Sequence, residues 1–206
     1  SRRVNHFIAN SRHVQKRIKK YYNQEATIIH PPVDTGLFTP DGSEGKEDYF
    51  LIVSAFAPYK RLDLAVDAFN QLNLPFFVIG EGQDGKRLKE MAKPNIHFEG
   101  WLDNSQIRSH FARCRAFIFC GEEDFGITLL EAQAMGRPVI ALGRGGALET
   151  VVPDSQSWKP ETGIDKSATS QPTGVFFYEQ TPESLMKAIQ HFESIESQFD
   201  ADAIRK

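Results

Sequence analysis

The chain has 206 residues, 40% of them hydrophobic and 25% charged, and its formal net charge is −3. This composition is ordinary for a soluble globular protein of one domain or slightly more, and the acidic balance does not suit a nucleic-acid partner. No apolar run approaches the roughly 20 residues of a membrane span, and the first residues lack the apolar core of a signal peptide, so we expect a cytoplasmic protein.

Short apolar runs alternate with helical stretches, which predicts an α/β fold with a doubly wound, Rossmann-like parallel sheet. The expected strands are Phe7–Ala9, Ala26–Ile29, Phe50–Val53, Phe76–Ile79, Ile96–Phe98, Ala116–Phe119, Val139–Ala141 and Val175–Phe177. The expected helices are Ser11–Tyr22, Arg61–Gln71, Gly85–Met91, Ser105–Cys114, Ile127–Met135 and Pro182–Glu193. Ligands in such folds bind beyond the carboxyl ends of the strands.

Two segments interrupt this alternation. Residues 30–46 combine prolines with Gly, Ser and Asp, which indicates a linker or an extended connection. Residues 153–172 are polar and lack a periodic pattern, so we expect a mobile loop there.

The first expected helix is strongly basic. The first 24 residues carry seven Lys or Arg and no Asp or Glu, and Val14, Ile18, Tyr21 and Tyr22 form an apolar stripe. A solvated helix face is the preferred interpretation, and contact with an acidic membrane surface is the alternative.

The sequence offers no pattern of metal ligands. Cys114 and Cys120 flank an apolar strand, which favours reduced thiols in the core of a cytosolic protein. The histidines show no metal-binding spacing, and the pair Asp200 and Asp202 fits the cap of a terminal helix better than a cation site. We therefore expect no metal site.

The most informative motif follows the strand Ala116–Phe119. Glu123 falls in the loop after that strand, the chain turns at Gly126, and Glu131 falls on the second turn of the next helix. The amides from Gly126 to Thr128 are the unpaired donors of a helix N-terminus, which favours an anion. Two carboxylates thus flank a place for a phosphate, which suits a ligand that is part sugar and part phosphate.

A pair of cations follows the strand Phe50–Val53. Lys60 and Arg61 open a helix at the ligand edge of the sheet, although cations oppose the dipole at a helix start. This placement favours a role in neutralising a diphosphate, with solvated charges as the alternative.

Two glycine-rich loops are weaker signals. Gly80–Gly85 is a G-x-G-x-x-G match between a strand and a helix, with Glu99 further on, as in dinucleotide-binding proteins. The motif follows the second strand of its unit instead of the first, however. The loop from Gly143 to Gly146, which contains Arg144, fits a ligand-approaching backbone or a plain turn about equally well.

Together these motifs resemble the donor-binding, C-terminal half of retaining GT-B glycosyltransferases of family four (group 1), in particular a mannosyltransferase-like subgroup. The segments that carry the resemblance are Ala9–Ser11, His30–Asp34, Val53–Arg61, Gly80–Gly82, His97–Leu102, the block Glu123–Ala141, and Gly145–Val151 to Thr173–Val175. The block with two glutamates eight residues apart and the tail Gly-x-Pro-Val-Ile-Ala is the most specific of them.

The resemblance implies a role for each matching residue. Glu123 and Lys60 would be catalytic, with Glu123 facing the donor sugar and Lys60 neutralising the leaving diphosphate. The donor-binding set would comprise Glu131, Arg61, Phe125, Gly126, Ile127, Thr128, Gly80, Gly82, Trp101, Leu102 and Arg144. Within this set Glu131 would bind the ribose hydroxyls, and Trp101 and Leu102 would border the base. Ala55 stands where the family usually has an arginine that shares the diphosphate, and Arg61 or Arg144 would have to replace it.

The resemblance also implies a division of the chain. Residues 1–30 would be a leading stub from the preceding acceptor domain together with a first strand, residues 31–48 a linker, and residues 49–206 the domain that binds the nucleotide sugar. The acceptor, a glycan or glycolipid, would be held by an N-terminal domain that this chain lacks, and the chain alone would be inactive. Contact with the inner face of a membrane is compatible with this arrangement.

The implied reaction is retaining transfer of a glycosyl group in polysaccharide biosynthesis, with loss of a nucleoside diphosphate and without metal or other cofactor. Glu123 as nucleophile and a same-face ion-pair route both remain open. The alternatives from other classes are a nicotinamide-binding dehydrogenase domain, a nucleotide-sugar epimerase on the same fold, and a catalytically silent binding module.

Overall fold

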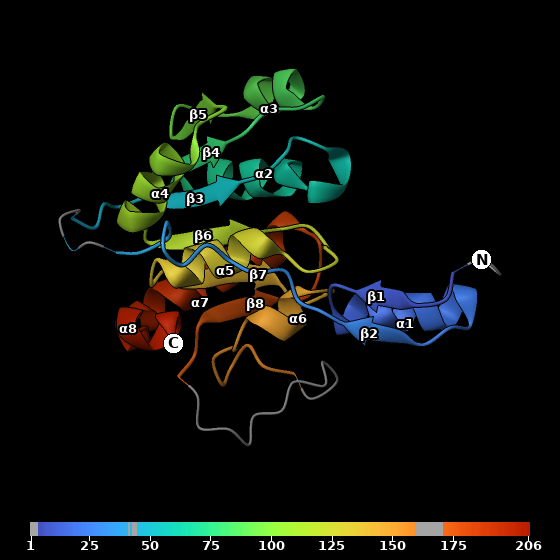
Figure 1. Ribbon diagram of the computed structural model, residues 1–206. Coiled ribbons are helices and arrows are strands. Elements are labelled where there is room, and N and C mark those ends of the chain that lie inside the picture. Colours follow the sequence, from blue (N-terminus) through green and yellow to red (C-terminus); the bar gives the residue numbers. More distant parts are fainter. Residues whose placement is uncertain (1–3, 41, 43–44, 160–170) are drawn as a thin grey trace.

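Two parallel sheets organise the chain. The computed structural model describes residues 4–40, 42, 45–159 and 171–206. Within these residues β1 (Phe7–Ala9) pairs with β2 (Ala26–Ile28), and six further strands form one sheet in the order β5-β4-β3-β6-β7-β8 (Figure 1). The six strands are β3 (Phe50–Val53), β4 (Phe76–Ile79), β5 (Ile96–Gly100), β6 (Ala116–Phe119), β7 (Val139–Leu142) and β8 (Gly174–Phe177).

Helices connect these strands. They are α1 (Arg12–Tyr22), α2 (Leu62–Leu72), α3 (Gly85–Met91), α4 (Asn104–Arg113), α5 (Ile127–Ala134), α6 (Ala147–Thr150), α7 (Pro182–Ile195) and α8 (Ala201–Arg205), with the 3-10 turns η1 (Pro58–Lys60) and η3 (Glu196–Gln198). All strand pairs are parallel, so the predicted α/β fold with a doubly wound parallel sheet is confirmed.

The six-stranded sheet is buried on both faces. β6, β7 and β8 have no exposed residue, as expected for continuous apolar strands in a parallel sheet. On one face Phe50, Ile118 and their neighbours pack against α2 and α7, and on the other Leu51 and Phe117 pack against α4 and α5. Burial on both faces makes the sheet a rigid platform for the loops at its edge.

The strand order reverses between β3 and β6, because the chain winds outward from β3 to β5 and then returns to β6. β3 and β4 stay in register to Val53 and Ile79, but β3 and β6 pair only at Phe50–Ala116 and Leu51–Phe117. The two central strands therefore separate toward their carboxyl ends. Such a switch point is where ligands bind in open α/β sheets.

The ends of several helices are set by capping side chains. Ser11 caps α1 by accepting from the amide of Val14, and Asp103 caps α4 through a reciprocal capping box with Gln106, so both helices begin after these residues. Asp200 caps α8, which confirms that prediction. Arg61 was expected to begin a helix, but it has a φ of 54° between η1 and α2, and α2 begins at Leu62.

Specific contacts hold described parts of the two connections, around Phe38 and at Pro153 and Asp154. Phe38 is buried in the core, and Arg205 of α8 donates to its carbonyl oxygen at 2.9 Å. Asp154 is 6% exposed, and Pro153 forms a β-bridge with Gly174. Pro153 and Asp154 at the start of the second connection are thus packed, while residues 160–170 lie outside the described part, so the expected mobility of this loop stays a prediction. The proposed domain boundaries at residues 30 and 48 stay a prediction.

The unit β1–α1–β2, hereafter the N-terminal unit, lies beside the main sheet (Figure 1). No residue of α1 is buried, and Tyr21 and Tyr22 are 67% and 57% exposed, so the expected apolar stripe is only partly covered. Ile8 and Ile29 are also exposed. This unit packs less completely than the rest of the described chain.

Candidate functional site

Two adjoining pockets lie at the switch point. The first, hereafter the α5 pocket, has a volume of about 370 Å³ and is lined by residues that follow β3 and β6 and by the start of α5. The second, hereafter the Trp101 pocket, has a volume of about 690 Å³ and is lined by the ends of β3 and β4 and by residues 101–104. Val53, Ser54, Ala55 and Thr128 line both. The pockets therefore form one groove along the carboxyl edge of the sheet.

Most of the predicted site residues line this groove. Those that line the α5 pocket are Lys60, Glu123, Phe125, Gly126, Ile127 and Thr128. Those that line the Trp101 pocket are Gly80, Trp101 and Leu102, together with Thr128, which borders both. Trp101 is 73% exposed, so its ring offers a free face at the rim of the groove.

Lys60 and Glu123 form an ion pair in the α5 pocket. The ammonium of Lys60 in η1 donates to the carboxylate of Glu123 in the loop after β6. Each side chain is only about one-fifth exposed, at 20% and 19%. The contact joins the two sides of the switch point, and an anionic ligand would compete with Glu123 for the ammonium.

The N-terminus of α5 opens into the same pocket. Gly126 takes a φ of 82° and precedes the helix, and no side chain caps the first turn. The free amides of this turn and the helix dipole provide a site that favours negative charge. Lys60 lines the same pocket, so the start of the helix and the ammonium group can bind the same anion.

Glu131 is half-buried on the second turn of α5. It lies three residues after Thr128, so the two side chains share one helix face. Burial raises the pKa of its carboxyl above the usual value. Glu131 does not line either pocket, and within the described residues the structure gives its carboxylate no hydrogen bond. A desolvated carboxylate near a groove can accept hydrogen bonds from hydroxyl groups of a ligand.

Arg61 and Arg144 are not brought into the groove. Arg61 contacts Asp63 at 3.2 Å between Nε and Oδ1, and Arg144 donates to the carbonyl oxygen of Tyr178 at 3.1 Å. Neither lines the two pockets. Neither arginine thus replaces the one expected at Ala55, which itself lines both pockets.

The glycines of the G-x-G-x-x-G match have a structural role. An added Cβ would lie 2.0 Å from the carbonyl oxygen of Ser54 at Gly80 and 2.6 Å from that of Phe56 at Gly82. These glycines let the loop after β4 cross the backbone after β3. Gly80 borders the Trp101 pocket but Gly82 does not line the groove, and the close backbone crossing by itself explains both glycines, so the dinucleotide interpretation loses its main support.

The second glycine loop supports Glu123. An added Cβ would lie 2.4 Å from the carbonyl oxygen of Glu123 at Gly145 and 2.3 Å from the Cα of Phe125 at Gly146. The amide of Gly146 donates to the carbonyl oxygen of Glu123 at 2.8 Å. The glycines thus allow close packing beneath the loop that carries Glu123, instead of approaching a ligand.

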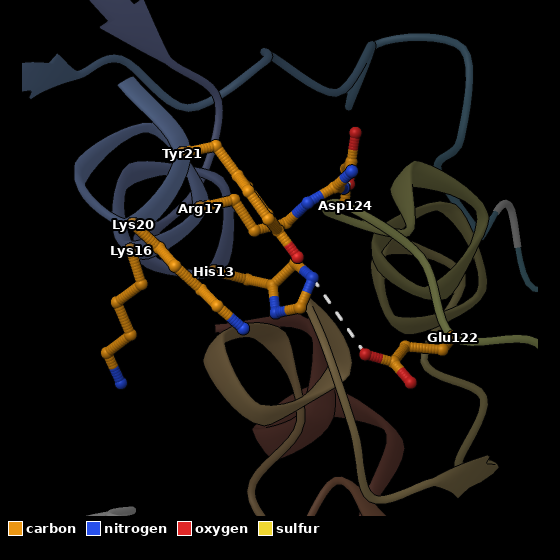
Figure 2. Close-up of a pocket in the computed structure, with 7 residues that line it drawn as sticks. All are labelled: His13, Lys16, Arg17, Lys20, Tyr21, Glu122 and Asp124. Carbon is orange, nitrogen blue, oxygen red and sulfur yellow. Dashed lines mark hydrogen bonds and ion pairs between the residues drawn. The ribbon is translucent and has the colours of Figure 1, made fainter. Parts of the chain in front are cut away.

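The N-terminal unit contacts the same loop. Figure 2 shows His13 and Arg17 of α1 facing Glu122 and Asp124, with 3.9 Å between Nε2 of His13 and Oε1 of Glu122, a contact that is an ion pair when the histidine is protonated. Arg17 Nη1 lies 2.7 Å from Asp124 Oδ1. The acidic neighbours on both sides of Glu123 are therefore paired with α1, while Glu123 is paired with Lys60.

A carboxylate of α6 caps α1. The amides of Arg12 and His13 donate to the carboxylate of Glu149 at 2.8 and 2.9 Å. Glu149 lies 137 residues from Arg12 in the chain, which is why sequence reasoning did not find this contact. The ring of His30 also stacks on Phe125, with centroids 5.3 Å apart.

Sequence reasoning missed further residues that line the α5 pocket. Asn10 and Pro31 come from the ends of β1 and β2, and Ser54 follows β3. All three lie in segments that carry the family resemblance, so the signal was present, but it assigned them no role.

A Ser, an Asp and a His meet elsewhere in the structure. Asp154 accepts from the hydroxyl of Ser157, and its Oδ1 lies 3.0 Å from Nε2 of His191. A nucleophilic triad needs the histidine in the middle, whereas here the aspartate is. Burial raises the pKa of Asp154, but the bonds from Ser157, His191 and the amide of Gln156 outweigh it and lower the pKa overall. The group is a structural link between residues 153–157 and α7.

Three further properties concern the described residues. No group of three or more His, Cys, Asp and Glu is arranged to hold a metal ion in this part of the chain. No helix described here has both the length and the apolar content that crossing a bilayer requires. Cys114 and Cys120 are buried free thiols, as predicted.

Known proteins are similar to this chain in sequence and in fold. An uncharacterized glycosyltransferase from Methanocaldococcus jannaschii is 26% identical over 147 residues, which cover 69% of this chain and 41% of the relative. A GDP-mannose-dependent alpha-(1-6)-phosphatidylinositol monomannoside mannosyltransferase from Mycolicibacterium smegmatis is 26% identical over 194 residues, covering 80% of this chain and 50% of the relative. The chain spans at most about half the length of these relatives.

The fold is shared with Anabaena HepE in complex with UDP and glucose. The two structures have a TM-score of 0.78 at 18% sequence identity, over 99% of this chain and 58% of HepE. The family described as Glycosyl transferases group 1 matches residues 37–205. The match includes the loop after β3, the block from Glu123 to Glu131 and the second glycine loop, and the chain therefore belongs to the group 1 glycosyltransferases.

Proposed function

We propose that this chain is the donor-binding half of a retaining glycosyltransferase and that it holds a nucleotide sugar in the groove at the switch point. The observation that carries the proposal is the Lys60–Glu123 ion pair beside the uncapped N-terminus of α5. It combines a cation, free amides and a carboxylate in one pocket of about 370 Å³. A sugar joined to a diphosphate needs all three.

The diphosphate occupies the start of α5 in this proposal. The amides of the first turn and the ammonium of Lys60 stabilise the negative charge that develops on the leaving phosphate. Binding of the diphosphate draws Lys60 away from Glu123. The carboxylate of Glu123 is then free to face the transferred sugar.

The configuration at the anomeric carbon of the sugar can be retained by two routes, and the proposal is compatible with both. Glu123 attacks the sugar as a nucleophile in the first, as carboxylates do in retaining glycosidases. In the second the acceptor enters on the face from which the diphosphate leaves, and Lys60 and α5 stabilise the ion pair.

The nucleoside extends into the Trp101 pocket. Trp101 and Leu102 line that pocket and border the base. Glu131, one turn behind Thr128, accepts hydrogen bonds from the ribose hydroxyls. A ligand that satisfies this carboxylate compensates for its desolvation.

The donor sugar is mannose and the nucleotide GDP in our working proposal, since the mycobacterial relative is GDP-mannose-dependent. The acceptor is a glycan or glycolipid held by a separate N-terminal domain, in keeping with a chain that spans at most half of the relatives considered. The enzyme acts on the cytoplasmic side, with α1 near the inner face of a membrane. None of these steps needs a metal.

The test is to separate the two glutamates by calorimetry with GDP, UDP, ADP and NAD. Glu131→Ala should weaken binding of the preferred diphosphate about ten- to hundredfold, because a hydrogen bond to a charged group contributes about 1.5–3 kcal/mol. Glu123→Ala should not weaken this binding, because it removes the carboxylate that competes with the diphosphate for the ammonium of Lys60.

The exposed Glu179 provides the control as Glu179→Ala. All variants must melt at the wild-type temperature without ligand. If NAD is the preferred ligand, the donor assignment is wrong and the dinucleotide interpretation replaces it. Unchanged affinity in Glu131→Ala would show that Glu131 does not hold the ribose.

A further inference from the structure

Asn10 is a polar residue of the α5 pocket that the proposed mechanism does not use. It follows β1 and lines the pocket together with Lys60 and Glu123. Its amide oxygen is buried, and the described residues offer it no hydrogen-bond partner. A buried polar atom without a partner costs free energy, so this side chain is a candidate for a contact that a ligand completes.

The backbone around Asn10 is held firmly. The carbonyl oxygen of Asn10 lies 3.0 Å from Nδ1 of His30, and the amide of Ile29 donates to Ala9 at 2.9 Å. Ser11, which is fully buried, caps α1. The stacking of His30 on Phe125 then fixes the ends of β1 and β2 against the loop that carries Glu123. Asn10 is thus positioned relative to the catalytic carboxylate.

The chemistry of the side chain selects its ligand. An amide is neutral and both donates and accepts hydrogen bonds, as a sugar hydroxyl does. The anionic part of the donor has better partners in the ammonium of Lys60 and the amides of α5. Asn10 lines the α5 pocket but not the Trp101 pocket, so it is remote from the place assigned to the nucleoside.

We propose that Asn10 binds hydroxyl groups of the transferred sugar, so that the N-terminal unit completes the sugar site from the end of β1. This inference rests on the proposed function, because it assumes that a nucleotide sugar occupies the groove. It assigns Asn10 to recognition of the sugar and not of the diphosphate.

The experiment compares the affinities of GDP and GDP-mannose by calorimetry in the chain as it stands. Asn10→Ala should weaken binding of GDP-mannose about three- to tenfold, on the scale of one neutral hydrogen bond, and leave that of GDP within about twofold. Asn10→Leu, which is similar in size and adds no charge but has no polar side-chain atom, should show the same selective loss. UDP and UDP-glucose serve as the pair if UDP binds more tightly than GDP.

The matched control is Asn5→Ala, because Asn5 is exposed in the segment just before β1. It should change neither affinity. Equal losses for GDP and GDP-mannose would show that Asn10 only maintains the pocket, and unchanged binding of GDP-mannose in both Asn10 variants would show that it does not touch the sugar. Either result overturns the inference alone. A wild-type chain that binds none of these four ligands overturns the proposed function itself.

Discussion

At the scale of single residues, three carboxylates in the loop after β6 have basic partners, whereas the carboxylate of Glu131 has none within the described residues. The charge of Glu123 is balanced by that of Lys60. Glu122 and Asp124 contact His13 and Arg17 of α1. Glu131 is half-buried, and burial raises the pKa of its carboxyl. A group that destabilises the unliganded fold but contacts the ligand is a common feature of binding sites.

We therefore expect Glu131→Gln to stabilise the chain without ligand at pH 7 and to weaken nucleoside diphosphate binding about tenfold. The folded state binds the proton of Glu131 more tightly than the unfolded state, so the wild type loses stability as the pH rises through the raised pKa. The stability difference should disappear below the ordinary carboxyl pKa of about 4.3. Melting curves at several pH values check this, with Glu179→Gln as control. A variant that is less stable than wild type at pH 7 would contradict it.

At the scale of elements, α1 depends on a residue outside its own sequence. Its first turn contains no acidic residue, and the carboxylate of Glu149 in α6 accepts from two of its amides. The same helix supplies the partners of Glu122 and Asp124 (Figure 2). This set of contacts joins the N-terminal unit to the loop that carries Glu123.

Glu149→Gln should loosen α1 while leaving the main sheet intact. The loss of a charged cap costs about 0.5–2 kcal/mol, so amide hydrogen exchange in α1 should accelerate about two- to thirtyfold. Hydrogen-exchange mass spectrometry compares the peptides of α1 and β6 in both proteins. Glu25→Gln is the control, because Glu25 pairs with Lys19 on the exposed surface. Unchanged protection of α1 would show that Glu149 does not hold it.

At the scale of the whole molecule, the groove exists because β3 and β6 separate after two paired positions. One side of the groove carries η1 and the other carries α5, and the N-terminal unit adds residues at one end. The charges that would meet a diphosphate come from Lys60 and the helix start.

Because Lys60 and the start of α5 supply the positive charge, binding of GDP or UDP should persist in EDTA. The affinity should stay within about twofold of that in Mg²⁺, which corresponds to about 0.4 kcal/mol. Lys60→Met should weaken binding under both conditions, because it removes the cation that takes the place of a metal. Calorimetry in both buffers provides the measurement. Affinity that is lost in EDTA and restored by Mg²⁺ or Mn²⁺ would contradict a metal-independent site.

Several features followed from the amino-acid sequence alone. Continuous apolar strands alternating with helices specified a doubly wound parallel sheet, because only a strand buried on both faces can be apolar throughout. The block from Glu123 to Glu131 specified a loop and a helix start with two carboxylates, and its spacing specified the family. Asp200 predicted the start of the last helix because capping is a local interaction.

Other features depended on the tertiary structure, because they join residues that are far apart in the chain. The sequence could not show that Lys60 pairs with Glu123, that Arg61 and Arg144 turn to other partners, or that Glu149 caps α1. It also suggested a ligand role for Gly82, whereas the crossing of two loops decides that only glycine fits there. Local patterns thus specified the elements and the family, while close packing between distant segments decided which side chains meet in the groove.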